Sequence, residues 1–368
     1  MSARNLTALP ARRARFHSLT VAELRMLTPD SVEVCFVVPP TLQNDFTFLP
    51  GQYLALRAIV DGRELRRSYS LCRASSPGRL SIAVKRDVGG AFSTWVTTAL
   101  RVGDHIDVMS PQGRFRSALL GHDNVHIAGI AAGSGITPLL ALVTAVLAES
   151  TTSRFSLVYS NRSAHDVMFL DELAEIKDRH PGRLALYHVL TREQRSSELL
   201  SGRLDADKLN RLLERALPPG TVDEWFLCGP FGLVQMCQQT LLRRGVDAAR
   251  VRCELFTTGV AAPPDRPRLA SPGEAWVTIE FTLDGQSSTV TSPVSARESI
   301  LSAALRVRAD VPYACAGGVC GTCRATLVSG AVAQNVSYAL EPDEIARGQI
   351  LTCQSHPTTD RVSVSYDA

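Results

Sequence analysis

Four cysteines near the end of the chain have a spacing that suits an iron–sulfur cluster. Cys315, Cys320 and Cys323 share one short loop, as C-x4-C-x2-C, and Cys353 follows about thirty residues later. This is the plant-type spacing of a [2Fe–2S] cluster, in which four thiolates hold two irons. The loop is also rich in glycine, which lets backbone N–H groups turn toward the sulfurs and offset their negative charge.

Zinc and disulfide bonds are the competing uses of these cysteines. Zinc would prefer a C-x2-C pair answered by a second pair or by histidines, and the motif lacks that second pair. A disulfide would require an oxidising compartment. The chain has nine cysteines, an odd number with four in the motif, which fits a reducing cytoplasm better. We therefore predict a [2Fe–2S] cluster in a cytoplasmic protein.

A second group of residues, Arg67-Ser68-Tyr69-Ser70, could bind a flavin. Tyr69 could cover the flat ring, Ser70 could bond its polar edge, and Arg67 could meet its phosphate. Alone, this short string is a weak signal, and a surface strand with an exposed arginine is its default interpretation. We interpret it as a flavin motif because of a second signal downstream.

That second signal is a glycine turn, Gly89-Gly90, that feeds a predicted helix near Ser93 to Leu100. Ser93 is a possible N-cap of this helix, and Gly90 allows close approach of the backbone. A helix N-terminus after a glycine turn is a natural cradle for phosphate. We therefore expect Gly90 and Ser93 at the flavin phosphates.

A third motif, Gly133-Ser134-Gly135-Ile136-Thr137-Pro138, is typical of nicotinamide binding. It differs from the dinucleotide fingerprint of a Rossmann fold, because Pro138 stands where a third glycine or alanine belongs. Gly133 and Gly135 still permit close backbone approach, and proline is tolerated in a first helical turn. The helix N-terminus would then face a pyrophosphate.

The end of the following strand bears on the choice between NADPH and NADH. Ser160 and Arg162 stand there, without an acidic residue to hold a free ribose 2′-OH. These side chains suit a 2′-phosphate, so we predict NADPH over NADH. The alternative is that Arg162 is a solvated loop residue.

Two further residues complete the predicted site. Cys228 follows a buried strand, where a small thiol could lie against the nicotinamide, although a buried cysteine is more often plain packing. Phe256 could cover the flavin face opposite Tyr69, or it could fill a domain interface.

These motifs require three kinds of element to position them. Short β-rich runs with turn signals predict an antiparallel flavin barrel over residues 16–118. Alternating strand and helix patterns predict a doubly wound parallel sheet over residues 119–256. The cysteines fall in a compact unit over residues 275–368, after a Pro-rich linker at residues 257–274. The expected strands are Val32–Val38, Gln52–Leu56 and Leu80–Lys85 in the barrel, and Val125–Ile130, Phe155–Tyr159, Leu184–Leu190, Glu224–Leu227 and Val251–Cys253 in the sheet.

Composition excludes several classes. The net charge is +3 from 39 basic and 36 acidic residues, with no basic stripe interleaved with aromatics, so nucleic acid is not an expected partner. The arginines of residues 1–15 lack an apolar segment behind them, which indicates a disordered tail rather than a secretory signal. The nearly uncharged stretch Val125–Ala148 could span a membrane, but its glycines and Pro138 favour a buried strand, a turn and a buried helix.

Taken together, the motifs resemble the ferredoxin–NADP reductase superfamily with a plant-type ferredoxin domain fused at the C-terminus. The resemblance covers nearly the whole chain, and the order of its domains matches the reductase components of oxygenases. Four stretches carry the closer match: Phe16–Ala22, Glu64–Ser70, Ala131–Pro138 and Leu340–Glu344. One departure is Ala316, since plant-type loops often carry a basic residue directly after the first ligand.

The resemblance implies a β-grasp fold for the last domain, FAD rather than FMN, NADPH as donor, and a di-iron oxygenase as electron acceptor. It assigns catalytic positions to Tyr69, Ser70, Thr137 and Cys228. A partner must reach the cluster edge, so we expect contact around residues 317–319. Two alternatives remain at this point: a reductase of a ring-hydroxylating dioxygenase that uses NADH and FMN or FAD, and a non-enzymatic iron–sulfur redox sensor.

Overall fold

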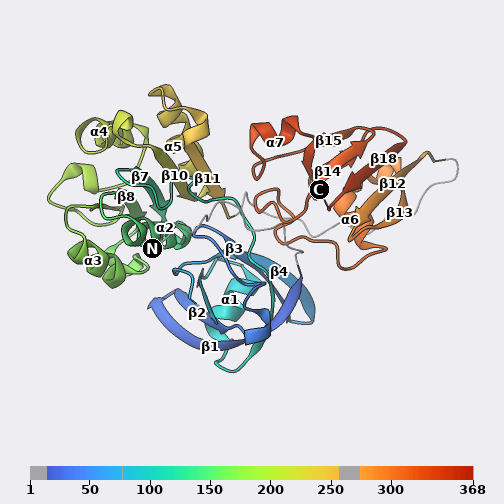
Figure 1. The fold of residues 1–368 in the computed structure, drawn as a ribbon, viewed down its shortest axis with the longest axis horizontal. Helices are drawn as coiled ribbons and strands as arrows, with labels where there is room; N and C mark the ends of the chain where they lie inside the picture. Colours follow the sequence, from blue (N-terminus) through green and yellow to red (C-terminus); the bar gives the residue numbers. More distant parts are fainter. Residues whose placement is uncertain (1–14, 77, 257–273, 368) are drawn as a thin grey trace. The chain divides into compact units, whose positions relative to one another are not determined.

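The computed structural model describes residues 15–76, 78–256 and 274–367. The chain divides into two compact units, the first ending at Glu254 and the second beginning at Leu255. Figure 1 shows their elements along the chain. All but the last residue of the predicted tail and all but the last residue of the predicted linker lie outside the described residues. Within the described part of the chain, no helix is long and apolar enough to cross a membrane.

The first unit begins with a six-stranded antiparallel sheet in the order β4-β3-β6-β1-β2-β5. Its interior is filled by apolar side chains from alternate strand positions, such as Leu54 and Leu56 on one strand and Val32, Val34 and Phe36 on another. The predicted flavin barrel is therefore confirmed in class. The strands are β1 (Phe16–Thr28), β2 (Ser31–Val37), β3 (Tyr53–Val60), β4 (Arg63–Ser70), β5 (Arg79–Lys85) and β6 (His105–Met109).

Two local features hold the strand that carries the flavin motif, one at each end of β4. Asp61 and Gly62 both have positive φ angles, 49° and 73°, which makes the tight hairpin between β3 and β4. The chain leaving β4 then bonds to β5, where the Cys72 N–H donates to the Ser81 carbonyl at 3.0 Å. The end of β4, which carries the flavin motif, is thus held on both sides.

A parallel sheet of order β11-β10-β7-β8-β9 follows in the same unit. The pairs β10–β7, β7–β8 and β8–β9 are parallel, as predicted for a doubly wound sheet. Helices α2 and α3 cover one side and α4 and α5 the other (Figure 1). The elements are β7 (His126–Ala132), α2 (Ile136–Glu149), β8 (Arg154–Asn161), α3 (Leu170–Arg179), β9 (Leu184–Leu190), α4 (Ala206–Arg215), β10 (Glu224–Gly229), α5 (Phe231–Arg243) and β11 (Val251–Leu255).

The chain reverses its direction of winding between β7 and β10, and there the glycine motif lies. A short 3-10 helix, Gly133–Gly135, joins β7 to α2. The stretch that could have been a membrane span is therefore a strand, a turn and a helix. Ligands of open α/β sheets bind in the crevice at such a switch point.

The second unit contains a mixed sheet of order β13-β12-β18-β14-β16, with α6 packed into its core and β15 paired with β17. Strands β12 and β18 are parallel and the other pairs in the sheet are antiparallel, as in the predicted β-grasp fold. The elements are β12 (Trp276–Leu283), β13 (Gln286–Pro293), α6 (Ile300–Leu305), β14 (Arg324–Ser329), β15 (Val332–Gln334), α7 (Pro342–Ala346), β16 (Gln349–Leu351), β17 (Ser355–Pro357) and β18 (Arg361–Ser365).

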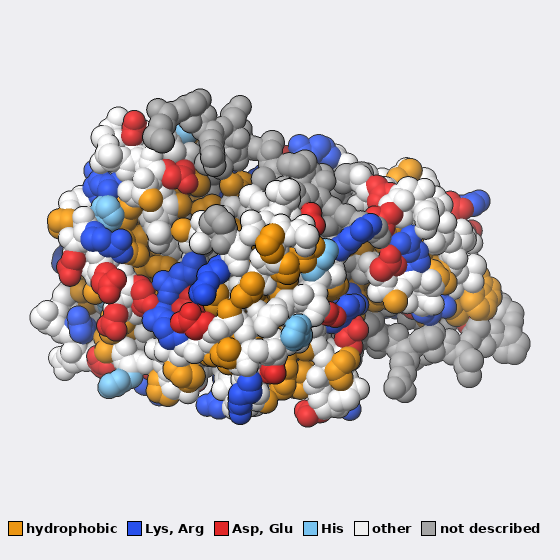
Figure 2. Space-filling view, turned by 60° about the horizontal axis from the view of Figure 1, so that its bottom comes forward, with side chains coloured by type: hydrophobic (Ala, Val, Ile, Leu, Met, Phe, Trp, Pro, Cys, Tyr) orange, Lys and Arg blue, Asp and Glu red, His pale blue; other side chains and the backbone are white. Residues whose placement is uncertain are grey.

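Basic and acidic side chains are interspersed on the face drawn in Figure 2, with hydrophobic side chains scattered between them. This mixing agrees with the near balance of 39 basic and 36 acidic residues.

Candidate cofactor sites

The flavin motif lies at the end of β4, where the barrel strand leaves its ladder. The Tyr69 ring stacks on Phe92 of α1 (Ala91–Thr98), with ring centroids 6.0 Å apart and planes inclined by 30°. Burial raises the pKa of the Tyr69 phenol, so the ring stays neutral and flat. The Arg67 guanidinium donates to the Arg66 carbonyl at 2.7 Å. The helix therefore fixes the tyrosine from one side.

Ser70 is almost fully buried, and its hydroxyl donates to the carboxylate of Glu254 at 2.8 Å. Glu254 stands on β11, 184 positions further along the chain. Sequence reasoning assigned no role to this glutamate. The signal that could have found it is its place at the carboxyl end of a parallel strand, where ligands bind in such sheets.

The glycine turn before α1 is built differently from the sequence prediction. Gly90, not Ser93, is the N-cap of the helix, so the predicted cap is wrong. The helix starts earlier because the turn closes earlier, where the Gly90 N–H donates to the Asp87 carbonyl at 3.1 Å. Ser93 lies in the first turn, where its hydroxyl donates to the Gly90 carbonyl at 3.1 Å and accepts from the Asp87 N–H at 3.0 Å.

This turn nevertheless has the shape of a phosphate cradle. A Cβ atom at Gly90 would lie 2.6 Å from the Ser93 hydroxyl and 2.9 Å from the Asp87 side chain, so only glycine fits. The backbone is free to approach a ligand closely at the N-terminus of an eight-residue helix. Gly90 has the open backbone that a phosphate site requires, while the Ser93 hydroxyl bonds within the turn; the roles of both residues at the flavin phosphates stay predictions.

The nicotinamide motif is pressed against the end of β10. A Cβ atom at Gly135 would lie 2.2 Å from the Cys228 carbonyl oxygen, which explains the glycine. Gly133 has a φ angle of 54° and its carbonyl accepts from the Tyr159 hydroxyl at 3.0 Å. Thr137 is buried and its hydroxyl donates to the Ser134 carbonyl at 3.0 Å. The predicted residues Gly133, Gly135, Thr137 and Cys228 therefore meet in one place.

Cys228 is fully buried at this crossing. Burial raises the pKa of its thiol well above the ordinary value, and the negative charge of Glu254 raises it further. The group is therefore a neutral thiol at physiological pH. Because Glu254 also bonds Ser70, this carboxylate connects the flavin motif with the nicotinamide motif.

The end of β8 carries Ser160 and Arg162, the residues predicted to select NADPH. Ser160 is buried, whereas the Arg162 side chain is 49% exposed. The Arg162 guanidinium pairs with Asp30, in the turn between β1 and β2, at 3.2 Å, and also with Asp166. Arg162 is therefore half-exposed but paired, and a 2′-phosphate would compete with two carboxylates for it.

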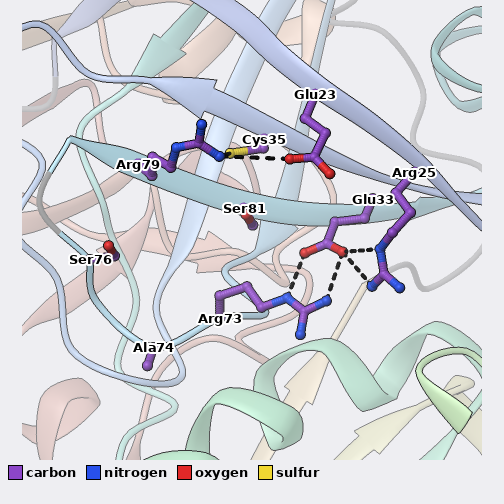
Figure 3. Close-up of a pocket in the computed structure, with 9 residues that line it drawn as sticks. All are labelled: Glu23, Arg25, Glu33, Cys35, Arg73, Ala74, Ser76, Arg79 and Ser81. Carbon is purple, nitrogen blue, oxygen red and sulfur yellow. Dashed lines mark hydrogen bonds and ion pairs between the residues drawn. The ribbon is translucent and has the colours of Figure 1, made fainter. Parts of the chain in front are cut away.

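A pocket of about 280 Å³ lies on the outer side of β1, β2 and β5. Glu33 points into it between two arginines, accepting from Arg73 Nε at 2.6 Å and from Arg25 Nη2 at 2.7 Å (Figure 3). Both arginines also pair with Glu172, which lies on helix α3 beside the parallel sheet. Burial alone would raise the pKa of Glu33, but the hydrogen bonds from Arg73 and Arg25 outweigh it and lower that pKa. Since Arg73 stands three positions after Ser70, this network holds the flavin motif and α3 together.

The four predicted cluster ligands lie in two pairs. The Cys315 thiol hydrogen-bonds to Cys320, and this contact is the main cause of the lowered pKa of Cys320. In the same way the Cys323 thiol bonds to Cys353 and lowers the pKa of Cys353. A search of the described residues finds no group of three or more side chains placed for one metal ion. Two pairs suit a cluster in which each of two irons takes two thiolates.

The loop around these cysteines also fits a cluster. The Gly317 N–H lies 3.4 Å from the Cys315 sulfur, and the Thr322 N–H and hydroxyl lie 3.5 and 3.2 Å from the Cys320 sulfur. Such donors stabilise negative charge on sulfur. A disulfide interpretation gives no reason for them, because the sulfurs of a disulfide carry no negative charge.

The predicted contact surface at residues 317–319 is partly wrong. Gly318 and Val319 are both buried. Gly318 is packed closely against Val336, since a Cβ atom at Gly318 would lie 2.7 Å from that side chain. Ala316 and Gly317 remain half-exposed beside the ligands. Phe256 is half-buried and directly follows β11, at the last described residue before the 257–273 stretch; its role at the flavin stays a prediction.

Comparison with known proteins identifies all three domains. The chain matches an oxidoreductase FAD-binding domain at residues 18–117, an oxidoreductase NAD-binding domain at residues 130–239, and a 2Fe-2S iron-sulfur cluster binding domain at residues 281–358. The solved structure of phthalate dioxygenase reductase, described as modular for electron transfer from pyridine nucleotides to [2Fe-2S], shares the fold. It has a TM-score of 0.56 and 25% identity, over 95% of this chain and 98% of that one.

Two relatives define the family more closely. A component of the 1,2-phenylacetyl-CoA epoxidase of Escherichia coli is 41% identical over 96% of this chain and 98% of its own length. The ferredoxin reductase component of 3-ketosteroid-9-alpha-monooxygenase from Mycobacterium tuberculosis is 34% identical over 95% of both chains. The chain belongs to the family of FAD- and [2Fe–2S]-containing ferredoxin reductases that serve as reductase components of oxygenases. It is an oxidoreductase that transfers electrons to an oxygenase, and the alternative of a non-enzymatic sensor falls away.

Proposed function

We propose that this reductase takes electrons from NADPH and delivers them to a di-iron oxygenase that epoxidises the aromatic ring of phenylacetyl-CoA. The observation that carries the proposal is the 41% identity to the Escherichia coli epoxidase component over 98% of that component's length. No large insertion or missing domain separates the two chains over that length. Since the cluster requires four thiolates, we also place the reaction in a reducing compartment such as the cytoplasm.

The bound flavin supplies the conversion of a two-electron hydride into single electrons. The chain's own residues hold the partners of that exchange in place. Ser70, bonded to Glu254, presents a hydroxyl at the flavin edge, and the neutral Cys228 thiol fills the buried crossing beside Gly135. None of these groups needs to take up a proton, because hydride transfer requires alignment rather than a general base.

Support for NADPH comes from the end of β8. Ser160 and Arg162 offer a hydroxyl and a cation where a 2′-phosphate would lie, and Arg162 is half-exposed rather than buried. Asp30 and Asp166 hold the guanidinium in the absence of a ligand. A phosphate with more charge than one carboxylate can displace them.

A second candidate is a reductase for another class of oxygenase, such as a ring-hydroxylating dioxygenase. It is favoured by the 34% identity to the 3-ketosteroid-9-alpha-monooxygenase component and by the shared fold with phthalate dioxygenase reductase. This candidate keeps the fold and the cofactor motifs and changes only the partner that accepts electrons.

The test is reconstitution of turnover. Purified phenylacetyl-CoA oxygenase, this chain and NADPH are incubated with phenylacetyl-CoA in air, and the epoxide product is measured. We expect oxygen-dependent product formation, and none with a Cys320→Ser chain that retains its flavin. Absence of product with phenylacetyl-CoA, together with efficient support of a ring-hydroxylating dioxygenase, would transfer the assignment to the second candidate.

A further inference from the structure

Arg324, the residue after the last cysteine of the cluster-binding loop, places its guanidinium against that loop. Arg324 directly follows Cys323 and begins β14. Its guanidinium lies against Gly321, since a Cβ atom there would be 3.4 Å from Arg324 Nη2. The same Nη2 donates to the Ala339 carbonyl at 3.0 Å. The positive charge is therefore fixed beside the turn between Cys320 and Cys323.

The guanidinium has an almost fully buried carboxylate as its counter-ion. Arg324 Nη1 lies 3.4 Å from Glu344 Oε1, and the two side chains are 22% and 2% exposed. Glu344 is held rigidly in the first turn of α7, where its other oxygen accepts from the Glu341 N–H at 2.8 Å in a capping box. A buried carboxylate is costly unless it is paired and hydrogen-bonded, and Glu344 has both kinds of partner.

We propose that the Arg324–Glu344 pair sets the reduction potential of the cluster. Reduction adds one electron, which comes from the flavin and leaves to the oxygenase, and no bond is formed or broken. The site thus becomes more negative by one charge. The Arg324 cation stabilises the reduced form, and the Glu344 anion offsets part of that stabilisation. Potentials of such clusters respond to local charge and to hydrogen bonding in this way.

The proposal predicts shifts of opposite sign from the two partners. Arg324→Gln removes the cation and lowers the potential. Glu344→Gln removes the anion, leaves the cation uncompensated, and raises the potential. Glutamine also serves at this position of a capping box, so Glu344→Gln keeps the start of α7. Each shift is expected to change the ratio of reduced to oxidised cluster about tenfold at fixed potential, or about 59 mV for one electron.

The same helix offers a matched control. Asp343 and Arg347 form an ion pair at 2.6 Å, but their side chains are 67% and 64% exposed. Asp343→Asn and Arg347→Gln change the same charges in water, where they are screened. Neither control is expected to move the potential.

The experiment is a redox titration of the full chain, loaded with flavin and cluster, followed by electron paramagnetic resonance of the reduced cluster. It requires no oxygenase, so its outcome is separate from the identity of the partner. Shifts of opposite sign, with Arg324→Lys close to the unchanged protein, support the proposal. Shifts of the same sign, or no shift, would show that the pair only holds the loop in shape. If Arg324→Gln does not retain its cluster, Glu344→Gln and Arg324→Lys still decide between these outcomes.

Discussion

Replacing Arg162 with alanine is expected to weaken the binding of NADPH and to leave NADH almost unchanged. The two cofactors differ by the 2′-phosphate alone, and Arg162 stands at the strand end where that phosphate would lie. In the structure its guanidinium is half-exposed and paired with Asp30 and Asp166. The size of the effect on NADPH affinity therefore depends on the free energy that is lost when the guanidinium leaves these carboxylates to bind the phosphate.

The magnitude follows from two opposing contributions. A charge-assisted contact with a phosphate contributes about 1.5–3 kcal/mol. Arg162 must loosen at least one partly exposed ion pair to make it, which costs about 0.2–1 kcal/mol. The net loss on removing Arg162 is then about 0.5–3 kcal/mol, or roughly two- to a hundredfold in affinity.

The assay is steady-state reduction of ferricyanide, with KM measured for each cofactor. Arg162→Ala is expected to raise KM for NADPH by that factor. Asp30→Asn removes one of the two carboxylates that pair with the guanidinium and is expected to lower KM for NADPH slightly. Arg211→Ala, an exposed arginine on α4, is the matched control and is expected to change neither cofactor. Equal increases of KM for NADPH and NADH would refute the reasoning, because Arg162 would then contribute to binding without reading the phosphate.

Three further perturbations test other parts of the structure. Glu33→Gln is expected to lower the free energy of unfolding of the first unit by about 2–3 kcal/mol. The loss is smaller than for a fully buried ion pair, because Arg25 and Arg73 stay partly exposed. Chemical unfolding followed by flavin fluorescence measures this free energy. Since the folded pKa of Glu33 is lowered, its contribution is present above about pH 4.5 and is lost as pH falls through the folded value, and the variant is expected to lack that loss. Gly135→Ala places a Cβ atom 2.2 Å from the Cys228 carbonyl and is expected to weaken NADPH binding at least tenfold with normal flavin content. Gly133→Ala meets no atom within 4 Å and is opposed only by the positive φ of 54°, so its effect is expected to be milder. Cys320→Ser is expected to keep ferricyanide reduction, which can draw on the flavin, and to abolish reduction of a one-electron protein acceptor; parallel loss of both activities in a folded, flavin-loaded protein would contradict the serial order.

Most of the fold could be predicted from the sequence because its signals are local. The run Leu184–Leu190 was predicted as a strand and is β9 with the same bounds. The glycine motif after β7 predicted a turn and a helix where the composition alone allowed a membrane span. The cysteine spacing identified the cluster loop, since three of its four ligands lie within nine residues.

The helix after the second flavin signal shows where local signals are insufficient. Serine is a common N-cap, so Ser93 was a reasonable choice from the sequence. The cap is Gly90 because the preceding turn is closed by a bond between Gly90 and Asp87, and Ser93 bonds back into that turn. The choice between the two depends on the backbone path, which a single sequence does not state.

The residues that sequence reasoning missed act through contacts between distant segments. Glu254 meets Ser70 across 184 positions, and Glu172 meets Arg25 across 147. In each case a charged side chain looks like an ordinary surface residue in the sequence, and only the fold shows that it is held by a partner. These charged partners therefore had no signal in the sequence, whereas the glycines and cysteines of the motifs could be identified from their spacing.

This division has a physical origin in the chemistry of the reductase. Cofactors are bound by backbone and sulfur, so the residues that contact them are constrained in type and spacing and can be read in sequence. The alignment of one cofactor with the next depends on how the barrel and the parallel sheet are joined. In this chain buried carboxylates make that join, because Glu33 binds arginines of the barrel while the same arginines bind Glu172 of α3. Glu33→Gln removes the charge there and leaves every cofactor motif intact, and we expect it to slow the reduction of the flavin by NADPH, because the barrel and the parallel sheet would no longer be held together by these ion pairs. Rapid-mixing measurement of flavin reduction checks this, and an unchanged rate would show that the join does not control the alignment.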